Sequence, residues 1–140
     1  LLIRNNIIES INDLISAGHR VIIIYPIPPV GIDVSKETYR IYLNTLLNTD
    51  NNFQHKIDIS TSYNVIKDRF RYSYEILDKI NHKNLSRIIP EKYLCNTYIK
   101  DRCATNNGKE LFYYDDDHLS IPGAELLLNS ILDEIVKTKK

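Results

Sequence analysis

The sequence has little of what identifies several broad classes of protein. Its 18 basic residues are balanced by 18 acidic residues, so no overall field favours nucleic acid or an anionic membrane as a partner. The longest unbroken apolar run covers only residues 21–25, whereas a membrane-spanning helix needs about 20 apolar residues. We therefore interpret the chain as an ordinary globular domain.

Methionine is absent, and the chain begins with Leu1 in a stretch that already has helical periodicity. Natural translation products normally begin with methionine, so we expect a piece of a longer protein whose targeting signals or membrane spans lie upstream. With 140 residues, the piece has the size of one domain at most, and we treat residues 1–140 as one unit.

Hydrophobic periodicity predicts helices that alternate with strands. Residues 20–25 form a β-branched run without polar alternation, which is typical of a strand buried on both faces of a parallel sheet. A second short strand is predicted over residues 85–89, where Pro90 stops it. Apolar residues at helical spacing predict helices over residues 3–15, 36–47, 62–80 and 122–135.

The order of these elements predicts an α/β fold with a parallel sheet. Two strands make a very small sheet, and so apolar a first strand favours parallel neighbours on both sides. We therefore expect further strands upstream of this chain. In the helix over residues 36–47, we expect Leu43, Leu46 and Leu47 to face inward. Loops or irregular chain are expected over residues 48–54 and 91–110, and a short extended piece over residues 111–114.

The segment YYDDDHLSIPGAELL, residues 113–127, places three aspartates and a histidine before the last predicted helix. One interpretation is helix capping. Acidic groups near a helix N-terminus gain roughly 0.3–1 kcal/mol from its dipole, and Ser120 just before Pro122 is a good N-cap. Capping alone does not account for His118, because a histidine cation is disfavoured at the positive end of a helix.

A metal site and a catalytic pair are the other two interpretations of this segment. Aspartate-rich runs suit hard cations, but the spacing of a calcium loop is not present. Zinc needs further His or Cys ligands, and the other three histidines are scattered along the sequence. In the catalytic interpretation, Asp115 of an Asp-x-x-His pattern orients His118, so that the histidine can take a proton from a serine. Loops after the strands of open α/β sheets commonly carry such sites.

The block LFYYDDDHLSIPGAELL, residues 111–127, resembles the last conserved block of SGNH/GDSL-type hydrolases. More narrowly, it is similar to the SGNH-like domain fused behind the membrane-embedded acyltransferase-3 domain in bacterial O-antigen and polysaccharide O-acetyltransferases. Two further stretches agree with this resemblance, namely GHRVIIIYPIPPVGIDV at residues 18–34 and YLCNTYIKDRC at residues 93–103.

The resemblance implies a fold, an activity and the roles of two residues. The fold is a flavodoxin-like, three-layer α/β/α arrangement with a parallel sheet, of which this chain would be the C-terminal portion without the N-terminal strands. Asp115 would orient His118, which would activate a serine for acetyl transfer or ester hydrolysis on a cell-surface polysaccharide. No metal or organic cofactor is needed for that chemistry. Asp116 and Asp117 would be loop or helix-end residues.

The serine nucleophile of the family is not in this sequence. In the family it belongs to a Gly-Asp-Ser block near the N-terminus of the domain, whereas the four glycines here are followed by His, Ile, Lys and Ala. The resemblance therefore implies that the serine, and a membrane-embedded acyltransferase domain, lie upstream. This chain alone would be inactive, since a general base without its nucleophile does no covalent catalysis.

Cys95 and Cys103 are the two cysteines of the chain. They are either incidental thiols or a disulfide, and an even count in a loop-rich stretch favours the disulfide. A stable disulfide implies an oxidising compartment. That agrees with the extracytoplasmic location, tethered to the inner membrane, that the resemblance implies.

Three residues are expected to line a substrate pocket near Asp115 and His118. The proline-rich loop after residues 20–25 ends a strand, and the resemblance adds that Pro26 and Pro28 line the acyl or sugar pocket. Tyr114 is a further candidate, because its ring can stack on a sugar. Two alternatives stay open: a stand-alone secreted SGNH esterase, and a catalytically inactive glycan-binding or scaffolding module.

Overall fold

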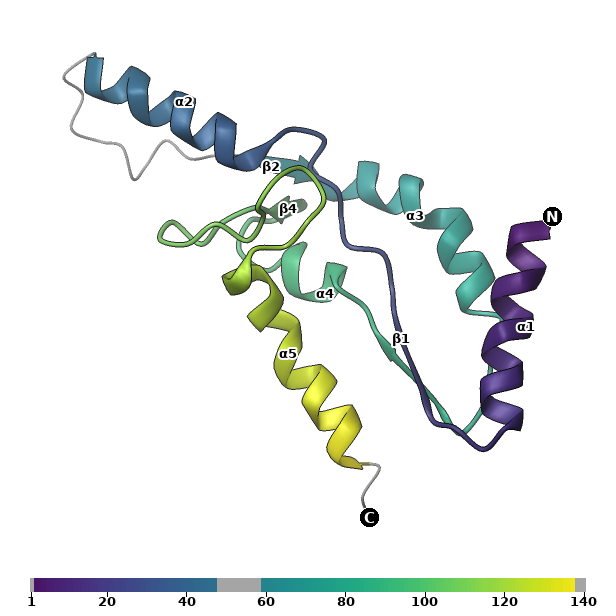
Figure 1. Ribbon diagram of the computed structural model, residues 1–140. Coiled ribbons are helices and arrows are strands. Elements are labelled where there is room, and N and C mark those ends of the chain that lie inside the picture. The colour runs from purple at the N-terminus through teal and green to yellow at the C-terminus, as the bar shows by residue number, and fades with distance from the viewer. Residues whose placement is uncertain (1, 48–58, 138–140) are drawn as a thin grey trace.

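The computed structural model describes residues 2–47 and 59–137 (Figure 1). The elements in chain order are α1 (Leu2–Ser16), β1 (Val21–Ile24), α2 (Val34–Leu47), β2 (Ser60–Ser62), α3 (Tyr63–Leu77), β3 (Leu85–Ile88), α4 (Glu91–Leu94), β4 (Arg102–Ala104) and α5 (Ile121–Val136). All four predicted helices and both predicted strands are present. The loop predicted over residues 48–54 lies outside the described residues. In the described chain, none of the helices has the length and apolar character needed to pass through a membrane.

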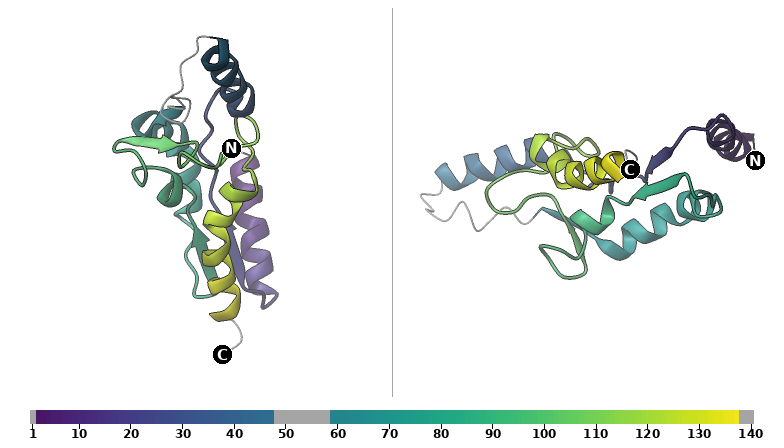
Figure 2. Two further views of the ribbon diagram at one scale, coloured as in Figure 1. Left: turned by 90° about the vertical axis from the view of Figure 1, so that its left-hand side faces the viewer. Right: turned by 90° about the horizontal axis from the view of Figure 1, so that it is seen from below.

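A parallel pair of strands forms the middle of three layers (Figures 1 and 2). β1 pairs with β3 in parallel, with Val21 opposite Leu85 and Ile24 opposite Ile88. On one side α1 and α3 cover the sheet, and on the other side α5 packs against β3. The buried residues between the sheet and the helices α1 and α3 are Ile15, Ile23, Tyr25, Ile80 and Leu85. The predicted α/β fold with a parallel sheet is confirmed.

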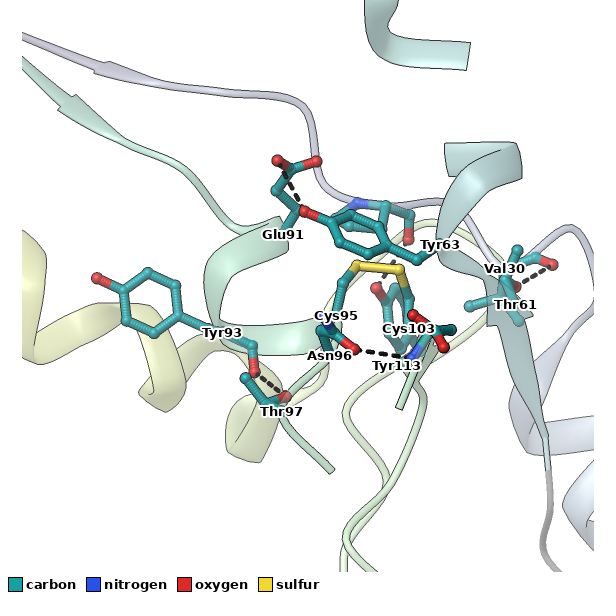
Figure 3. The surroundings of a disulfide bond; sticks show 12 residues. Val30, Thr61, Tyr63, Glu91, Tyr93, Cys95, Asn96, Thr97, Cys103 and Tyr113 are labelled. Carbon is teal, nitrogen blue, oxygen red and sulfur yellow. Dashed lines mark hydrogen bonds between the residues drawn. A yellow bond between two sulfur atoms is a disulfide. The ribbon is translucent and has the colours of Figure 1, made fainter. Parts of the chain in front are cut away.

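A second buried cluster surrounds a small antiparallel pair formed by β2 and β4. Thr61 of β2 lies opposite Cys103 of β4, and a disulfide joins Cys103 to Cys95 (Figure 3). The cluster contains Val34, Ile59, Ile66, Phe70, Leu94, Phe112 and Tyr113. Neither of these strands nor α4 was predicted, because three or four residues are too few for a hydrophobic period to be recognised.

Removal of the disulfide is expected to destabilise this second cluster. Its closed loop spans a sequence separation of 8, for which the chain-entropy model gives a contribution of about 2.5 kcal/mol. The loop is also held by the amide of Asn96, which donates to the carbonyl of Arg102 at 2.8 Å. We expect Cys95→Ala and Cys103→Ala together to lower the free energy of unfolding by about that amount in urea titrations. Wild-type protein in reducing agent is the control and should match the double variant. An unchanged unfolding midpoint would contradict the prediction.

The side of α2 that was predicted to face inward is exposed, which corrects that prediction. The helix extends away from the body of the molecule (Figure 1), and Leu43, Leu46 and Leu47 are all exposed, Leu47 to 80%. Val34 and Thr45 are the buried residues of this helix. Helical periodicity locates the apolar side of a helix, but it does not show whether another element covers that side.

Within the described residues, the second edge of β1 is unpaired. The strand pairs with β3 alone, and Ile24 is 50% exposed. On α5, Leu128 and Leu132 are exposed as well. A further parallel strand would pair at this edge and would bury the apolar side chains beside it. Strands upstream of this chain stay a prediction.

Candidate functional site

The loop of residues 113–118 lies between the second buried cluster and the start of α5. Tyr113 and Leu119 form an antiparallel bridge at the base of the loop. The amide of Tyr114 donates to the carbonyl of His118 at 2.8 Å, so the chain closes on itself within five residues. The residues predicted to carry the chemistry are therefore held in one tight turn.

Ser120 caps the N-terminus of α5, so the aspartates are not needed as capping residues. Its hydroxyl oxygen accepts a hydrogen bond from the amide of Gly123 at 3.3 Å, and Pro122 stands in the first turn. The Ser120 hydroxyl in turn donates to the carbonyl of Leu111. No acidic residue lies in the first turn of the helix. The capping interpretation thus holds for Ser120 and does not account for the three aspartates.

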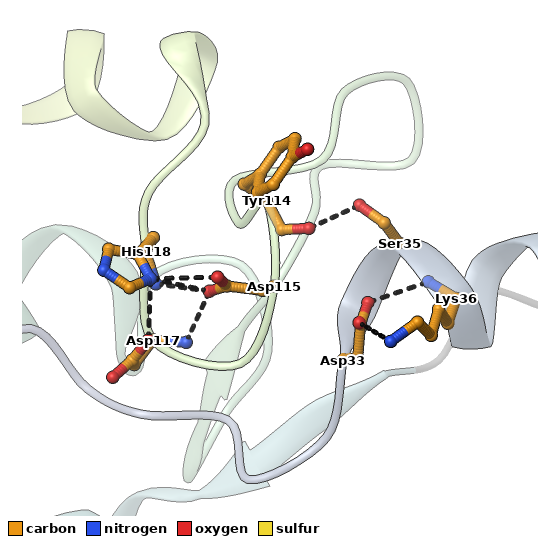
Figure 4. A network of polar contacts seen from close by, with 7 residues as sticks. All are labelled: Asp33, Ser35, Lys36, Tyr114, Asp115, Asp117 and His118. Atoms are coloured by element: carbon orange, nitrogen blue, oxygen red, sulfur yellow. Dashed lines mark hydrogen bonds and ion pairs between the residues drawn. The ribbon is translucent and has the colours of Figure 1, made fainter.

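Asp115 and His118 contact each other directly (Figure 4). Oδ2 of Asp115 lies 2.9 Å from Nδ1 of His118. The other carboxylate oxygen, Oδ1, accepts the amides of Asp117 at 3.1 Å and of His118 at 2.8 Å. Oδ1 also lies 3.1 Å from Nδ1 of His118, so the backbone amides hold the carboxylate with both oxygens toward the imidazole ring. This is the arrangement in which a carboxylate fixes the tautomer of a catalytic histidine.

The same contacts set the charge states of the pair. The two backbone amides of His118 and Asp117 are the main reason why the pKa of Asp115 falls to about 2. The hydrogen bond that Asp115 accepts from the ring, followed by the charges of Asp115 and Asp117, raises the pKa of His118 above its ordinary value. Asp115 is therefore ionised at any ordinary pH, and His118 holds a proton more strongly than a free histidine.

Asp117 contributes a contact that was not predicted. Its Oδ1 lies 2.9 Å from the same Nδ1 of His118, so two carboxylates face one ring nitrogen. The Asp-x-x-His pattern points only to the residue three positions before the histidine, and the adjacency of Asp117 in the sequence was the one available signal. Asp116 is a loop residue, as predicted, and its backbone carbonyl accepts the amide of Val30 at 2.7 Å.

The carboxylates and the ring lie close enough to share a cation. Asp115, Asp117 and His118 each offer an atom within 4.8 Å of the others, and within the described chain no fourth His, Cys, Asp or Glu joins them. A structural zinc site takes four protein ligands, and exposed acidic groups are common without an ion. We assign no metal to this cluster.

The three residues predicted to line a substrate pocket differ in exposure. Tyr114 is 73% exposed beside the loop, and Pro26 is partly buried. Pro28 is fully buried, and its carbonyl accepts a hydrogen bond from the hydroxyl of Tyr113 at 2.7 Å. Since its side chain offers no surface to a substrate, the prediction for Pro28 is corrected: its role lies in the packing under the loop.

The described residues bring no serine to the pair. The side chain of His118 is 75% exposed, and its Nε2 has no hydrogen-bond partner within the described part of the chain. Ser35, which lies beside the loop in Figure 4, donates instead to the carbonyl of Tyr114 at 2.6 Å. The site is thus a histidine whose inner nitrogen is held by carboxylates and whose outer nitrogen is open.

Comparison with known proteins gives one finding. The family model described as "SGNH domain (fused to AT3 domains)" matches residues 2–133. No curated protein and no solved structure matches the chain. The match covers both buried clusters, the disulfide and the loop of residues 113–118.

Proposed function

The chain belongs to the family of SGNH domains that are fused to AT3 domains, and we propose that it supplies the histidine and the aspartate of a Ser-His-Asp acyltransferase or esterase. Family membership makes it a hydrolase-like module associated with an acyltransferase. The finer proposal is that Asp115 orients His118, which acts as the general base. The substrate class that we propose is a cell-surface polysaccharide with acylated or acylatable hydroxyls.

One observation supports the catalytic roles above all others: Nδ1 of His118 lies 2.9 Å from the Asp115 carboxylate, while the opposite nitrogen is open. A general base needs one nitrogen that is fixed as a donor and another that is free to accept a proton. The side chain of His118 is 75% exposed, so Nε2 is accessible to an incoming hydroxyl group. The exposed Nε2 therefore supports catalysis.

The proposed reaction proceeds in two steps. A serine hydroxyl attacks the carbonyl carbon of the acyl donor, and Nε2 of His118 accepts the hydroxyl proton. The acyl–oxygen bond of the donor breaks, and the leaving group takes that proton from His118. In the second step a sugar hydroxyl, or water in an esterase, gives its proton to Nε2 and attacks the acyl-serine. The serine departs and recovers its proton from His118.

We propose that the serine comes from a segment outside this chain, upstream of it. The unpaired edge of β1 and the exposed Ile24 suit a further parallel strand that would carry the nucleophile at its carboxyl end. In this proposal a membrane-embedded AT3 domain in the same protein provides the acyl group. The SGNH domain then works on the extracytoplasmic side, where the disulfide of Cys95 and Cys103 is stable.

Tyr114 is the residue that we propose to contact the sugar. It is adjacent to Asp115 and 73% exposed, so its ring can stack on a sugar face. Pro26 is partly buried at the end of β1 and would border the same space. No cofactor enters this scheme.

The test of the function is the pH dependence of serine labelling in the full-length protein. His118 accepts a proton only when it is neutral, and Asp115, Asp116 and Asp117 all raise its pKa. The rate of labelling by a fluorophosphonate probe should therefore rise about tenfold per pH unit up to that raised pKa and level off above it. Asp115 stays ionised throughout, because its pKa is about 2.

Removing the carboxylate gives the control for this profile. In Asp115→Asn the inflection should move to lower pH, since the hydrogen bond to the carboxylate is the largest cause of the raised pKa of His118. A full-length protein that the probe does not label would favour a catalytically inactive glycan-binding module. Labelling at a rate independent of pH would remove His118 from the mechanism.

A further inference from the structure

Tyr113 is a buried tyrosine next to the candidate site, and the catalytic scheme gives it no role. It is 1% exposed, and its hydroxyl donates to the carbonyl of Pro28 at 2.7 Å. Burial raises the pKa of its hydroxyl, so the group stays a neutral donor. The hydrogen bond joins the base of the loop of residues 113–118 to the segment that follows β1, 85 residues earlier in the chain.

The three residues after Tyr113 are held by the same segment. The carbonyl of Tyr114 accepts the hydroxyl of Ser35 at 2.6 Å. The carbonyls of Asp115 and Asp116 accept backbone amides of the segment, as follows: Val34 to Asp115 at 3.3 Å, and Val30 to Asp116 at 2.7 Å. Three consecutive carbonyls of the loop therefore point at one surface, made by the chain between β1 and the first turn of α2.

These hydrogen bonds to residues 28–35 anchor the loop to the rest of the protein, which the contacts inside the loop cannot do. The hydrogen bonds between Asp115 and the amides of Asp117 and His118 hold the loop from within, but they do not fix its place on the protein. The direction of the Asp115 carboxylate also depends on the backbone of Asp115, whose carbonyl accepts the amide of Val34 from the anchoring segment. The anchors to residues 28–35 fix where Nε2 of His118 stands relative to β1. A misplacement of about 1 Å in a catalytic group costs on the order of 10²-fold in rate.

We propose that Tyr113 and Ser35 are positioning residues, which hold the Asp115–His118 loop against residues 28–35 so that the open nitrogen of the histidine is presented at a fixed place. Tyr113 acts through the carbonyl of Pro28, and Ser35 acts through the carbonyl of Tyr114. Neither touches the reacting atoms. The inference rests on the proposed function for its effect on rate, but the placement of the loop can be measured without any reaction.

Tyr113→Phe and Ser35→Ala in the full-length protein test this role. We expect kcat for p-nitrophenyl acetate hydrolysis to fall about 10-fold in each variant, with KM within about twofold of wild type, because alignment is lost and binding surface is not. The pKa of His118, followed by NMR of its ring proton, should fall toward the ordinary value as the carboxylate loses its alignment.

Tyr25→Phe is the matched control. Tyr25 is also 1% exposed, and its hydroxyl donates to Asp78 at 2.6 Å and accepts from Arg87 at 3.1 Å. We expect Tyr25→Phe to lower the thermal midpoint at least as much as Tyr113→Phe, while kcat and the pKa of His118 stay at the wild-type values. Ser35, which is only partly buried, tests the same anchor without any change in the core.

The outcomes separate this inference from the proposed function. A wild-type protein that neither hydrolyses the ester nor reacts with a fluorophosphonate speaks against the function, and the NMR titration of His118 then still decides on positioning. If the pKa of His118 is unchanged in both Tyr113→Phe and Ser35→Ala, the inference is overturned. It is equally overturned if Tyr25→Phe reproduces the effects of Tyr113→Phe.

Discussion

The His118→Ala variant of the full-length protein is expected to lose p-nitrophenyl acetate hydrolysis by about 10³-fold or more. The reason is that His118 is the one histidine of the loop, and the carboxylates of Asp115 and Asp117 lie at Nδ1, on the other side of the ring from the open Nε2. Fluorophosphonate labelling of the serine should slow by a similar factor, since the same proton must leave the hydroxyl. Both rates are measured at a pH above the raised pKa of His118.

His19→Ala is the control for this loss. His19 is exposed just after α1, and its backbone amide, which the substitution keeps, donates to the carbonyl of Leu14. Its hydrolysis rate should equal that of the wild type. A His118→Ala protein that is folded and retains its rate would show that the exposed histidine is not the base. The chain would then supply no catalytic residue to the enzyme.

Substitution of the two carboxylates at Nδ1 should lower the hydrolysis rate in graded steps. Asp115→Asn keeps the shape of the side chain but removes the charge that orients the ring, a change that cost about 10⁴-fold in a serine protease. Here Asp117 also lies 2.9 Å from that nitrogen. We therefore expect a smaller loss in Asp115→Asn than in His118→Ala, and a loss close to that of His118→Ala when Asp117→Asn is added. Equal rates in the single and double variants would show that Asp117 gives no support.

The features that could be predicted from the sequence depend on contacts between residues close together in the chain. The helices α1, α2, α3 and α5 and the strands β1 and β3 were predicted, because each has an apolar pattern within its own residues. The contact between Asp115 and His118 was predicted for the same reason: the two residues lie three positions apart in one turn, and their contact at 2.9 Å needs no other part of the fold. Patterns within one segment therefore predict the structure of that segment.

The predictions that were wrong or absent depend on distant segments. Leu43, Leu46 and Leu47 were expected inside, but whether α2 has a partner on that side is decided elsewhere in the chain. The pairing of β2 with β4 joins residues about forty positions apart. Pro28 was placed at a pocket, yet it is buried by Tyr113, 85 residues later. The hydrogen bonds that place the loop on the protein belong to this long-range class and have no sequence pattern.

The start of α5 shows how closely the loop and the helix are built together. Gly123 is buried in the first turn of the helix. A Cβ at this position would lie 2.0 Å from the carbonyl oxygen and 2.8 Å from the carbonyl carbon of Phe112. Real atoms do not approach so closely, and both are backbone atoms that cannot rotate away. The same carbonyl of Phe112 accepts the amide of Ser120 at 2.9 Å, so the start of α5 and the segment before the loop are in direct backbone contact.

Gly123→Ala is therefore expected to lower the free energy of unfolding by about 3 kcal/mol, the upper end of the range for overpacked sites. Inside a helix the same substitution ordinarily raises stability by about 1 kcal/mol, so the sign itself is diagnostic of the close approach. Urea titration of the full-length protein measures the loss, and Asn129→Ala, at an exposed position of α5, should be neutral or stabilising. Because Tyr113 directly follows Phe112, the shift that makes room for the methyl group must also move the loop of His118. Reduced hydrolysis in the molecules that remain folded would show this displacement, whereas a Gly123→Ala protein as stable as the wild type would contradict the packing described for this turn.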